Sequence, residues 1–145
     1  MRRFLSSGGG ALVVLGVLAW LLASGSALSS APPVVAAQLA AIVLTVWARR
    51  TFAVSQFRAG AEPGAGPLLA AGPYRYVRHP MYAAALLLVW ACVLGHWSVV
   101  NALAGAVVTA VIAARIPVEE QLLRTRYPEY EAYAARTRRL VPFLL

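Results

Sequence analysis

Two short segments carry most of the side chains in this sequence that could do chemistry. The first reads GPYRYVRHPMY (residues 72–82) and combines arginine, histidine and tyrosine. The second reads RIPVEE (residues 115–120) and adds an arginine and a pair of glutamates. Arginine pairs with carboxylate or phosphate, and glutamate binds amines and hydroxyls. Brought together, the two segments would suit a zwitterionic ligand that carries both a carboxylate and an amine.

The chain around these segments is strongly apolar. Of its 145 residues, 61% are hydrophobic and 12% are charged, and the mean hydropathy is +0.70. Soluble domains carry about 25% charged residues. Four apolar runs without charged residues predict transmembrane helices at residues 11–28, 31–48, 81–95 and 98–114. The first two would each be about 27 Å long as helices, close to the ~30 Å hydrocarbon thickness of a bilayer.

We therefore expect an all-α integral membrane protein, with four transmembrane helices, a cytoplasmic C-terminal helix and a cofactor pocket, in a single domain over residues 1–145. The alternative for the short third run is a buried hairpin in a soluble protein. The single cysteine, Cys92, lies within the third run and predicts a packing role, since it forms no disulfide framework or paired metal motif. We expect no metal site.

The arginines predict the orientation. All thirteen basic residues are arginine, and they fall before the first run, between the second and third, and after the fourth. By the positive-inside rule, both termini and the long loop face the cytoplasm. The net charge of +8 then faces anionic lipid headgroups, and no recognisable motif points to nucleic acid. The N-terminus also resembles a secretory signal, but three further runs follow and favour an uncleaved anchor.

The topology should bring the two polar segments together. Pro80 disfavours helical geometry at His79 and suits the first turn of the third helix, so YRYVRH is expected to be extended. Such a helix start is a natural anion site. If the third and fourth helices form a hairpin, Arg115 emerges beside His79. Pro117 is expected in the first turn of the cytoplasmic helix, where the helix dipole favours glutamate. The bland alternative is that arginine and tyrosine simply occupy a membrane interface.

The motifs also support a resemblance. GPYRYVRHPMY, a two-helix hairpin and RIPVEEQLLRTRYPEYEAYAARTRRLVPF resemble the isoprenylcysteine carboxyl methyltransferase family and the related membrane phospholipid methyltransferases, over residues 68–145. The resemblance implies an integral-membrane methyltransferase that uses S-adenosylmethionine. Its acceptor would be lipophilic and enter from the bilayer, the namesake acceptor being the α-carboxylate of an isoprenylated cysteine. The alternative acceptor is a phospholipid or a small lipophilic amine or thiol.

The resemblance also implies roles for individual residues. Arg78 and Arg115 would be catalytic, with Arg115 orienting the acceptor. The cofactor would be bound by Tyr76, His79, Tyr82, Glu119 and Glu120. One departure is Ala84, at a position where the family often has glycine. Two other functions stay open from the sequence, namely an NADPH-dependent membrane reductase and a non-catalytic membrane subunit.

Overall fold

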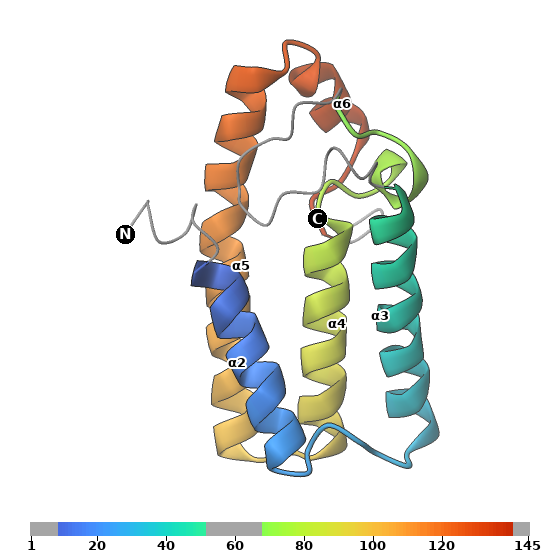
Figure 1. Cartoon of the computed structure of the whole chain (residues 1–145), viewed down its shortest axis with the longest axis vertical. Coiled ribbons are helices and arrows are strands. Elements are labelled where there is room, and N and C mark those ends of the chain that lie inside the picture. Colours follow the sequence, from blue (N-terminus) through green and yellow to red (C-terminus); the bar gives the residue numbers. More distant parts are fainter. Residues whose placement is uncertain (1–8, 52–67, 141–145) are drawn as a thin grey trace.

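The computed structural model describes residues 9–51 and 68–140 (Figure 1). Within these ranges the chain forms five α-helices and one short 3-10 helix, so the predicted all-α class is confirmed. The elements are α2 (Gly9–Ala23), α3 (Pro32–Thr51), η2 (Gly72–Arg75), α4 (Pro80–Gly95), α5 (Val99–Arg126) and α6 (Tyr130–Arg136). The predictions for the arginines at positions 2, 3 and 58, for most of the long loop and for the end of the last motif lie outside the described residues.

Two helices, α3 and α5, are long and apolar enough to cross a membrane. The other two apolar helices, α2 and α4, have 15 and 16 residues. At 1.5 Å per residue they are about 23–24 Å long, shorter than a typical hydrocarbon layer. Large apolar side chains stay exposed on the outer faces of the helices, among them Leu12 (69%), Val43 (65%) and Leu103 (62%). These faces suit a lipid environment.

The first helix is shorter than the sequence predicted. It ends at Ala23 and not at Leu28, because Gly25 takes a left-handed conformation with φ 72°. Its N–H bonds the carbonyl of Leu22, and the Ser24 hydroxyl donates to the carbonyl of Leu21. Glycine at this position is a common helix stop.

The fourth helix is much longer than predicted. Residues 99–126 form one continuous helix, so the expectation that Pro117 begins a separate cytoplasmic helix is wrong. Proline removes one backbone hydrogen bond inside a helix, but tertiary contacts on both sides of it outweigh that loss. Ile116 is buried before it and Glu120 after it. Consequently Glu119 and Glu120 lie in the last turns of α5, where the helix dipole does not favour them.

The segment before α4 is only partly extended. Gly72–Arg75 forms the 3-10 helix η2, in which Tyr74 N–H bonds the carbonyl of Ala71, so the prediction of an extended run over all of YRYVRH is wrong. The chain extends only at Val77, which forms a parallel bridge with Arg138. Pro80 starts α4 as predicted. This bridge ties the chain after α6 to the beginning of α4.

The core lies between α2, α4 and α5, and α3 packs on the other side of α4 (Figure 1). Gly105 of α5 lets α4 approach closely, since a Cβ there would lie 3.3 Å from Val93 Cγ2. Cys92 is 3% exposed within this core, so its predicted packing role is confirmed. α5 extends beyond α3 and α4, and α6 lies at this extended end (Figure 1).

Gly72, the first residue of η2, packs against Thr51 at the end of α3. A substitution at Gly72 therefore tests how much this contact between α3 and η2 contributes to stability. Gly72 has φ 56°, and an added Cβ would collide with Oγ1 of Thr51. Gly25 also has a positive φ, 72°, but no atom lies within 4 Å of an added Cβ. A left-handed non-glycine residue costs roughly 1–2 kcal/mol, and overpacking costs about 1–3 kcal/mol more. We expect Gly72→Ala to lower the free energy of unfolding in detergent by about 2–5 kcal/mol, and Gly25→Ala by only about 1–2 kcal/mol. Equal losses would mean that the contact with Thr51 adds nothing.

Candidate active site

Six residues that the sequence singled out divide between the start of α4 and the second half of α5. Five of them make mutual polar or ring contacts at one end of the bundle, and Arg115 joins them through Tyr82. We refer to this set as the polar cluster: Arg78, His79, Tyr82, Arg115, Glu119 and Glu120. The predicted meeting of the two segments is therefore present in the structure, although α5 achieves it by continuing through Pro117.

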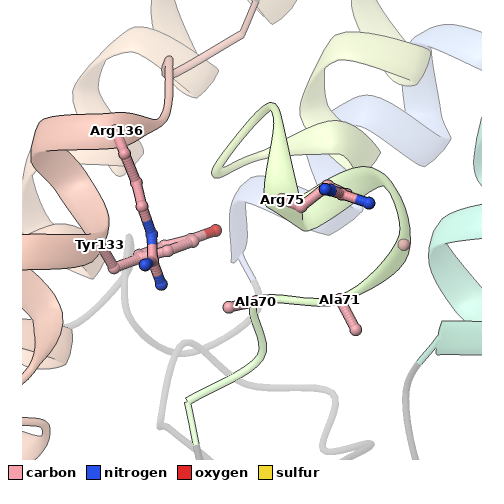
Figure 2. Close-up of a pocket in the computed structure, with 6 residues that line it drawn as sticks. Ala70, Ala71, Arg75, Tyr133 and Arg136 are labelled. Atoms are coloured by element: carbon pink, nitrogen blue, oxygen red, sulfur yellow. The ribbon is translucent and has the colours of Figure 1, made fainter.

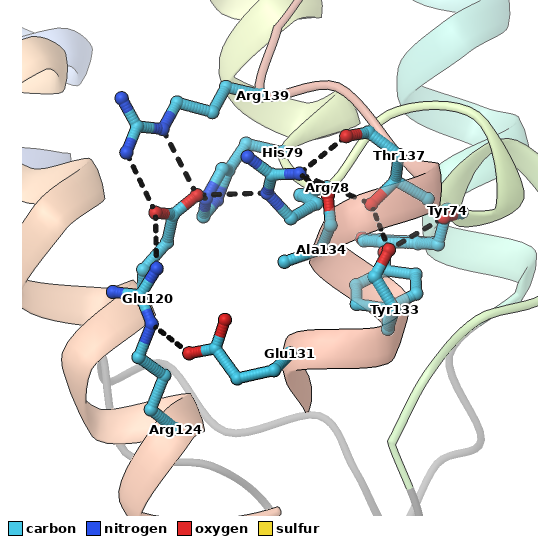
Figure 3. A network of polar contacts seen from close by, with 10 residues as sticks. All are labelled: Tyr74, Arg78, His79, Glu120, Arg124, Glu131, Tyr133, Ala134, Thr137 and Arg139. Carbon is cyan, nitrogen blue, oxygen red and sulfur yellow. Dashed lines mark hydrogen bonds and ion pairs between the residues drawn. The ribbon is translucent and has the colours of Figure 1, made fainter. Parts of the chain in front are cut away.

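Glu120 lies at the centre of the cluster and is 1% exposed. Its Oε1 accepts a hydrogen bond from Arg78 Nε at 2.9 Å, and its Oε2 accepts one from Arg139 Nη2 at 3.2 Å (Figure 3). Arg124 Nη2 lies 3.8 Å from Oε2. Burying a carboxylate costs several kcal/mol, which cations and hydrogen bonds offset. Glu120 thus depends on arginines from three separate segments.

Arg78 also fastens α6 to the bundle. Its Nη1 donates to the carbonyl of Ala134 at 2.8 Å and to the carbonyl of Thr137 at 2.5 Å (Figure 3). The last carbonyls of a helix have no partner within the helix, so a guanidinium at this position satisfies them. One side chain therefore holds α6 and neutralises Glu120.

Tyr82 connects α4 to the other face of α5. Its hydroxyl donates to Glu119 Oε2 at 2.7 Å and accepts a hydrogen bond from Arg115 Nε at 2.6 Å. Its ring stacks on His79 with centroids 5.5 Å apart. Arg115 and Glu119 are four residues apart and so share one face of the helix. A continuous chain of hydrogen bonds runs from the buried Arg115 through the phenol to Glu119.

Three buried polar atoms have no hydrogen-bond partner in the part of the chain that the structure describes. They are His79 Nε2, the Tyr130 hydroxyl and His96 Nδ1, the last at the opposite end of α4. His79 Nε2 lies 3.6 Å from Glu120 Oε1, beyond hydrogen-bond distance. Burial, and then the charge of Glu120, raises the pKa of Tyr130 to about 12, so this phenol stays protonated at neutral pH. The described residues therefore do not satisfy the hydrogen-bonding capacity of either His79 Nε2 or the Tyr130 hydroxyl.

Tyr76 does not join the cluster. It is 49% exposed, and the guanidinium of Arg75 lies 5.2 Å from its ring centroid. Its carbonyl accepts a hydrogen bond from Arg138 N–H at 3.0 Å. The ring of Tyr76 therefore lies at the surface outside the cluster, while its main chain ties this segment to the chain after α6.

The sequence reasoning missed Thr137 and Arg139, which follow α6 and complete the site. Arg139 bonds Glu120, and Thr137 accepts from Arg78. Tyr133 donates from its hydroxyl to the carbonyl of Tyr74 at 2.8 Å, and burial raises its pKa. The signal that could have found Arg139 is its position in the resembling segment, directly before Leu140-Val-Pro-Phe.

One cavity lies beside the cluster and not within it. Its volume is about 460 Å³, and its lining includes Arg75, Tyr133 and Arg136 (Figure 2). Two of the predicted site residues, Tyr82 and Arg115, line a different and smaller cavity of about 70 Å³. Among the described residues no group of His, Cys, Asp or Glu could hold a metal ion.

Because Arg78 binds both Glu120 and the end of α6, we expect even a substitution by lysine to lower the stability of the protein markedly. Lysine presents one compact ammonium and cannot serve Glu120 and two carbonyls at once. Disrupting a buried ion pair costs about 3–5 kcal/mol, so we expect Arg78→Lys to lower the free energy of unfolding by roughly 3 kcal/mol. Arg75→Lys is the control, because Arg75 is exposed and close to Tyr76, and should change stability by under about 0.5 kcal/mol. Similar unfolding curves for the two variants in detergent would contradict the double role.

Comparison with known proteins gives one match. No curated protein and no solved structure matches the chain. A family model described as phospholipid methyltransferase matches residues 34–130, which run from α3 to the first residue of α6. This segment covers more than half of the chain and contains the whole polar cluster. The chain therefore belongs to the phospholipid methyltransferase family, whose members are membrane methyltransferases that use S-adenosylmethionine.

Proposed function

We propose that this protein methylates the amine of a lipid headgroup, with S-adenosylmethionine as methyl donor and the polar cluster as the active site. Family membership gives methyl transfer from S-adenosylmethionine to a lipid. The observation that carries the amine assignment is the hydrogen bond from Tyr82 to Glu119, which holds a half-buried carboxylate beside Arg115. A carboxylate attracts an ammonium group and repels another carboxylate.

The residues of the cluster fit the cofactor. S-adenosylmethionine carries a carboxylate, an ammonium and a sulfonium, and the cluster combines arginines, glutamates and aromatic rings. The unpartnered atoms, His79 Nε2 and the Tyr130 hydroxyl, offer hydrogen bonds that the described chain leaves unused. We assign cofactor binding to His79, Tyr82 and Glu120, with the main chain at Tyr76. Glu119, which the resemblance also gives to the cofactor, is assigned here to the acceptor amine. Arg78 shapes the pocket by holding α6 and Glu120 in place.

The chemistry divides between the cofactor and the chain. Bound S-adenosylmethionine would supply an activated methyl group. The methyl carbon would bond to the acceptor nitrogen while the carbon–sulfur bond breaks and leaves its electron pair on sulfur. An ammonium headgroup has no lone pair, so it must lose a proton first. Glu119 is the carboxylate in position to take that proton, and Tyr82 holds it there. Arg115 orients the phosphate of the same headgroup, and burial of His79 and Arg115 excludes water.

The membrane arrangement is part of the proposal. We infer four crossings within a single domain of residues 1–145, with both termini and the polar cluster on the cytoplasmic side, as the arginine distribution predicts. Arg49 and Arg50 lie in the last turn of α3, and the end of α3 lies beside the start of α4, where the cluster begins (Figure 1). A cytoplasmic cofactor would reach this end directly, and a lipid would reach it from the bilayer.

The isoprenylcysteine carboxyl methyltransferases are a related branch, and their acceptor is the second candidate. A carboxylate acceptor already has its lone pair and would need only Arg115 for orientation. Glu119 would then stand close to the acceptor and repel it. Membership in a methyltransferase family also favours methyl transfer over the reductase and the non-catalytic subunit considered from the sequence.

Binding of S-adenosylmethionine to the detergent-purified protein tests the cofactor site. We expect saturable binding by calorimetry that weakens at least about tenfold in His79→Ala, because a hydrogen bond to a charged group contributes about 1.5–3 kcal/mol. His96→Ala is the matched control, since the only other histidine lies at the opposite end of α4. It should bind within about twofold of the wild type. Displacement of S-adenosylmethionine by NADPH, or equal effects of the two substitutions, would contradict the site.

The role of Glu119 is tested with vesicles that contain phospholipid with ethanolamine headgroups. General-base catalysis contributes about 10²–10⁴-fold, so Glu119→Gln should lower kcat at least about 100-fold and S-adenosylmethionine affinity only a few-fold. Glu131→Gln is the control, because that side chain is 72% exposed and bonds Arg124. A prenylated cysteine peptide is the competing acceptor. Transfer to the peptide and not to the lipid would overturn the amine assignment.

A further inference from the structure

A small cavity lies between α2 and α5 next to the polar cluster. Its volume is about 70 Å³, and its lining includes Gly10, Ala11 and Val14 of α2, Val111 of α5, and Tyr82 and Arg115. A cavity needs only about 10–15 Å³ of such space to hold one water molecule. This one has room for a few groups of the size of water, as at the end of a small headgroup, and is too small for acyl chains. Helix α2 lies wholly before the family-matched segment, which begins at residue 34.

The walls of this cavity differ in chemistry. On the α2 side they are small and apolar. On the other side Arg115, which is 7% exposed, donates from Nε to the hydroxyl of Tyr82, and this hydroxyl donates in turn to Glu119. A cation and a phenol hydroxyl therefore border an otherwise apolar space, and a carboxylate lies behind the phenol, within one hydrogen bond of it. This is the charge pattern of a headgroup that carries a phosphate and an amine.

Gly10 is where α2 comes closest to Arg115. A Cβ at this position would lie 3.2 Å from Arg115 Nη1 and 3.3 Å from Val111 Cγ1. Gly10 is buried, whereas its neighbour Ala11 is exposed at the surface of the helix pair. A side chain longer than methyl at Gly10 would displace Arg115 or fill the cavity. The missing side chain thus keeps this space open.

We propose that α2 forms a wall of the acceptor subsite, and that Gly10 and Ala11 select a lipid with a small phosphate-linked amine headgroup. This inference rests on the proposed function and adds to it a binding determinant outside the family-matched segment. The headgroup phosphate lies against Arg115, its amine lies toward Tyr82 and Glu119, and its acyl chains stay outside the cavity along the apolar face of α2.

The test compares Gly10→Leu with Gly16→Leu in the full-length protein. Both changes place the same side chain in α2, but an added Cβ at Gly16 has no neighbour within 4 Å. We would measure binding of a short-chain phospholipid with an ethanolamine headgroup by calorimetry, without cofactor. S-adenosylmethionine affinity and methyl transfer to the same lipid would be measured separately. Gly10→Leu should weaken lipid binding and raise the lipid KM at least tenfold, with cofactor affinity within twofold. Gly16→Leu should match the wild type in all three.

The outcomes distinguish a failure of the acceptor wall from a failure of the proposed methyltransferase function. Unchanged lipid binding in Gly10→Leu overturns the acceptor wall but leaves the methyltransferase intact. Loss of cofactor affinity in Gly10→Leu also overturns it, because the cavity would then belong to the cofactor. If the wild type binds the lipid but not S-adenosylmethionine, the proposed function fails. The effect of Gly10→Leu on lipid binding then tests the acceptor wall by itself. Should Gly10→Leu not fold, Ala11→Leu narrows the same cavity from an exposed position and must give the same selective loss.

Discussion

The buried carboxylate of Glu120 is the constraint on which this end of the molecule depends. It is 1% exposed, and water cannot compensate its charge. The compensation comes from Arg78 before α4, from Arg124 one turn further along α5 and from Arg139 after α6. Arg124 and Arg139 are about half exposed, so solvent screens their contributions. Arg78, at 11% exposure, is the least exposed of the three, and its position follows from the bridge between Val77 and Arg138.

The continuity of α5 through Pro117 follows from the same constraint. Arg115 and Glu119 are four residues apart and both bond Tyr82, whereas Glu120 is turned by about 100° toward Arg78 and His79. One helix thus meets the start of α4 with two adjacent faces. A break at Pro117 would uncouple Arg115 from the glutamates and separate these faces. The lost backbone hydrogen bond is a smaller cost than an uncompensated buried charge.

The amino-acid sequence predicted the parts of the structure that local chemistry controls. The charge-free runs predicted the helices, Pro80 predicted the start of α4, and the hairpin predicted that His79 and Arg115 lie at one end. It did not predict where α2 and α5 end, because a left-handed Gly25 stops one helix and tertiary contacts carry the other through Pro117. Nor did it predict the pairing of Arg139 with Glu120, since this contact depends on how the chain returns after α6.

The two sides of the proposed site face different physical constraints. The cofactor side lies in the family-matched segment, and nearly every polar group there is tied to another, so a single change leaves a buried charge or donor without its partner. The acceptor side includes α2, whose contribution is apolar and whose contact with Arg115 occurs at a glycine. Apolar walls can change size at the cost of packing alone. If members of such a family share one cofactor and accept different lipids, substitutions in the first helix would change the acceptor at the smallest loss of stability. In this chain that helix, α2, lies before the family-matched segment.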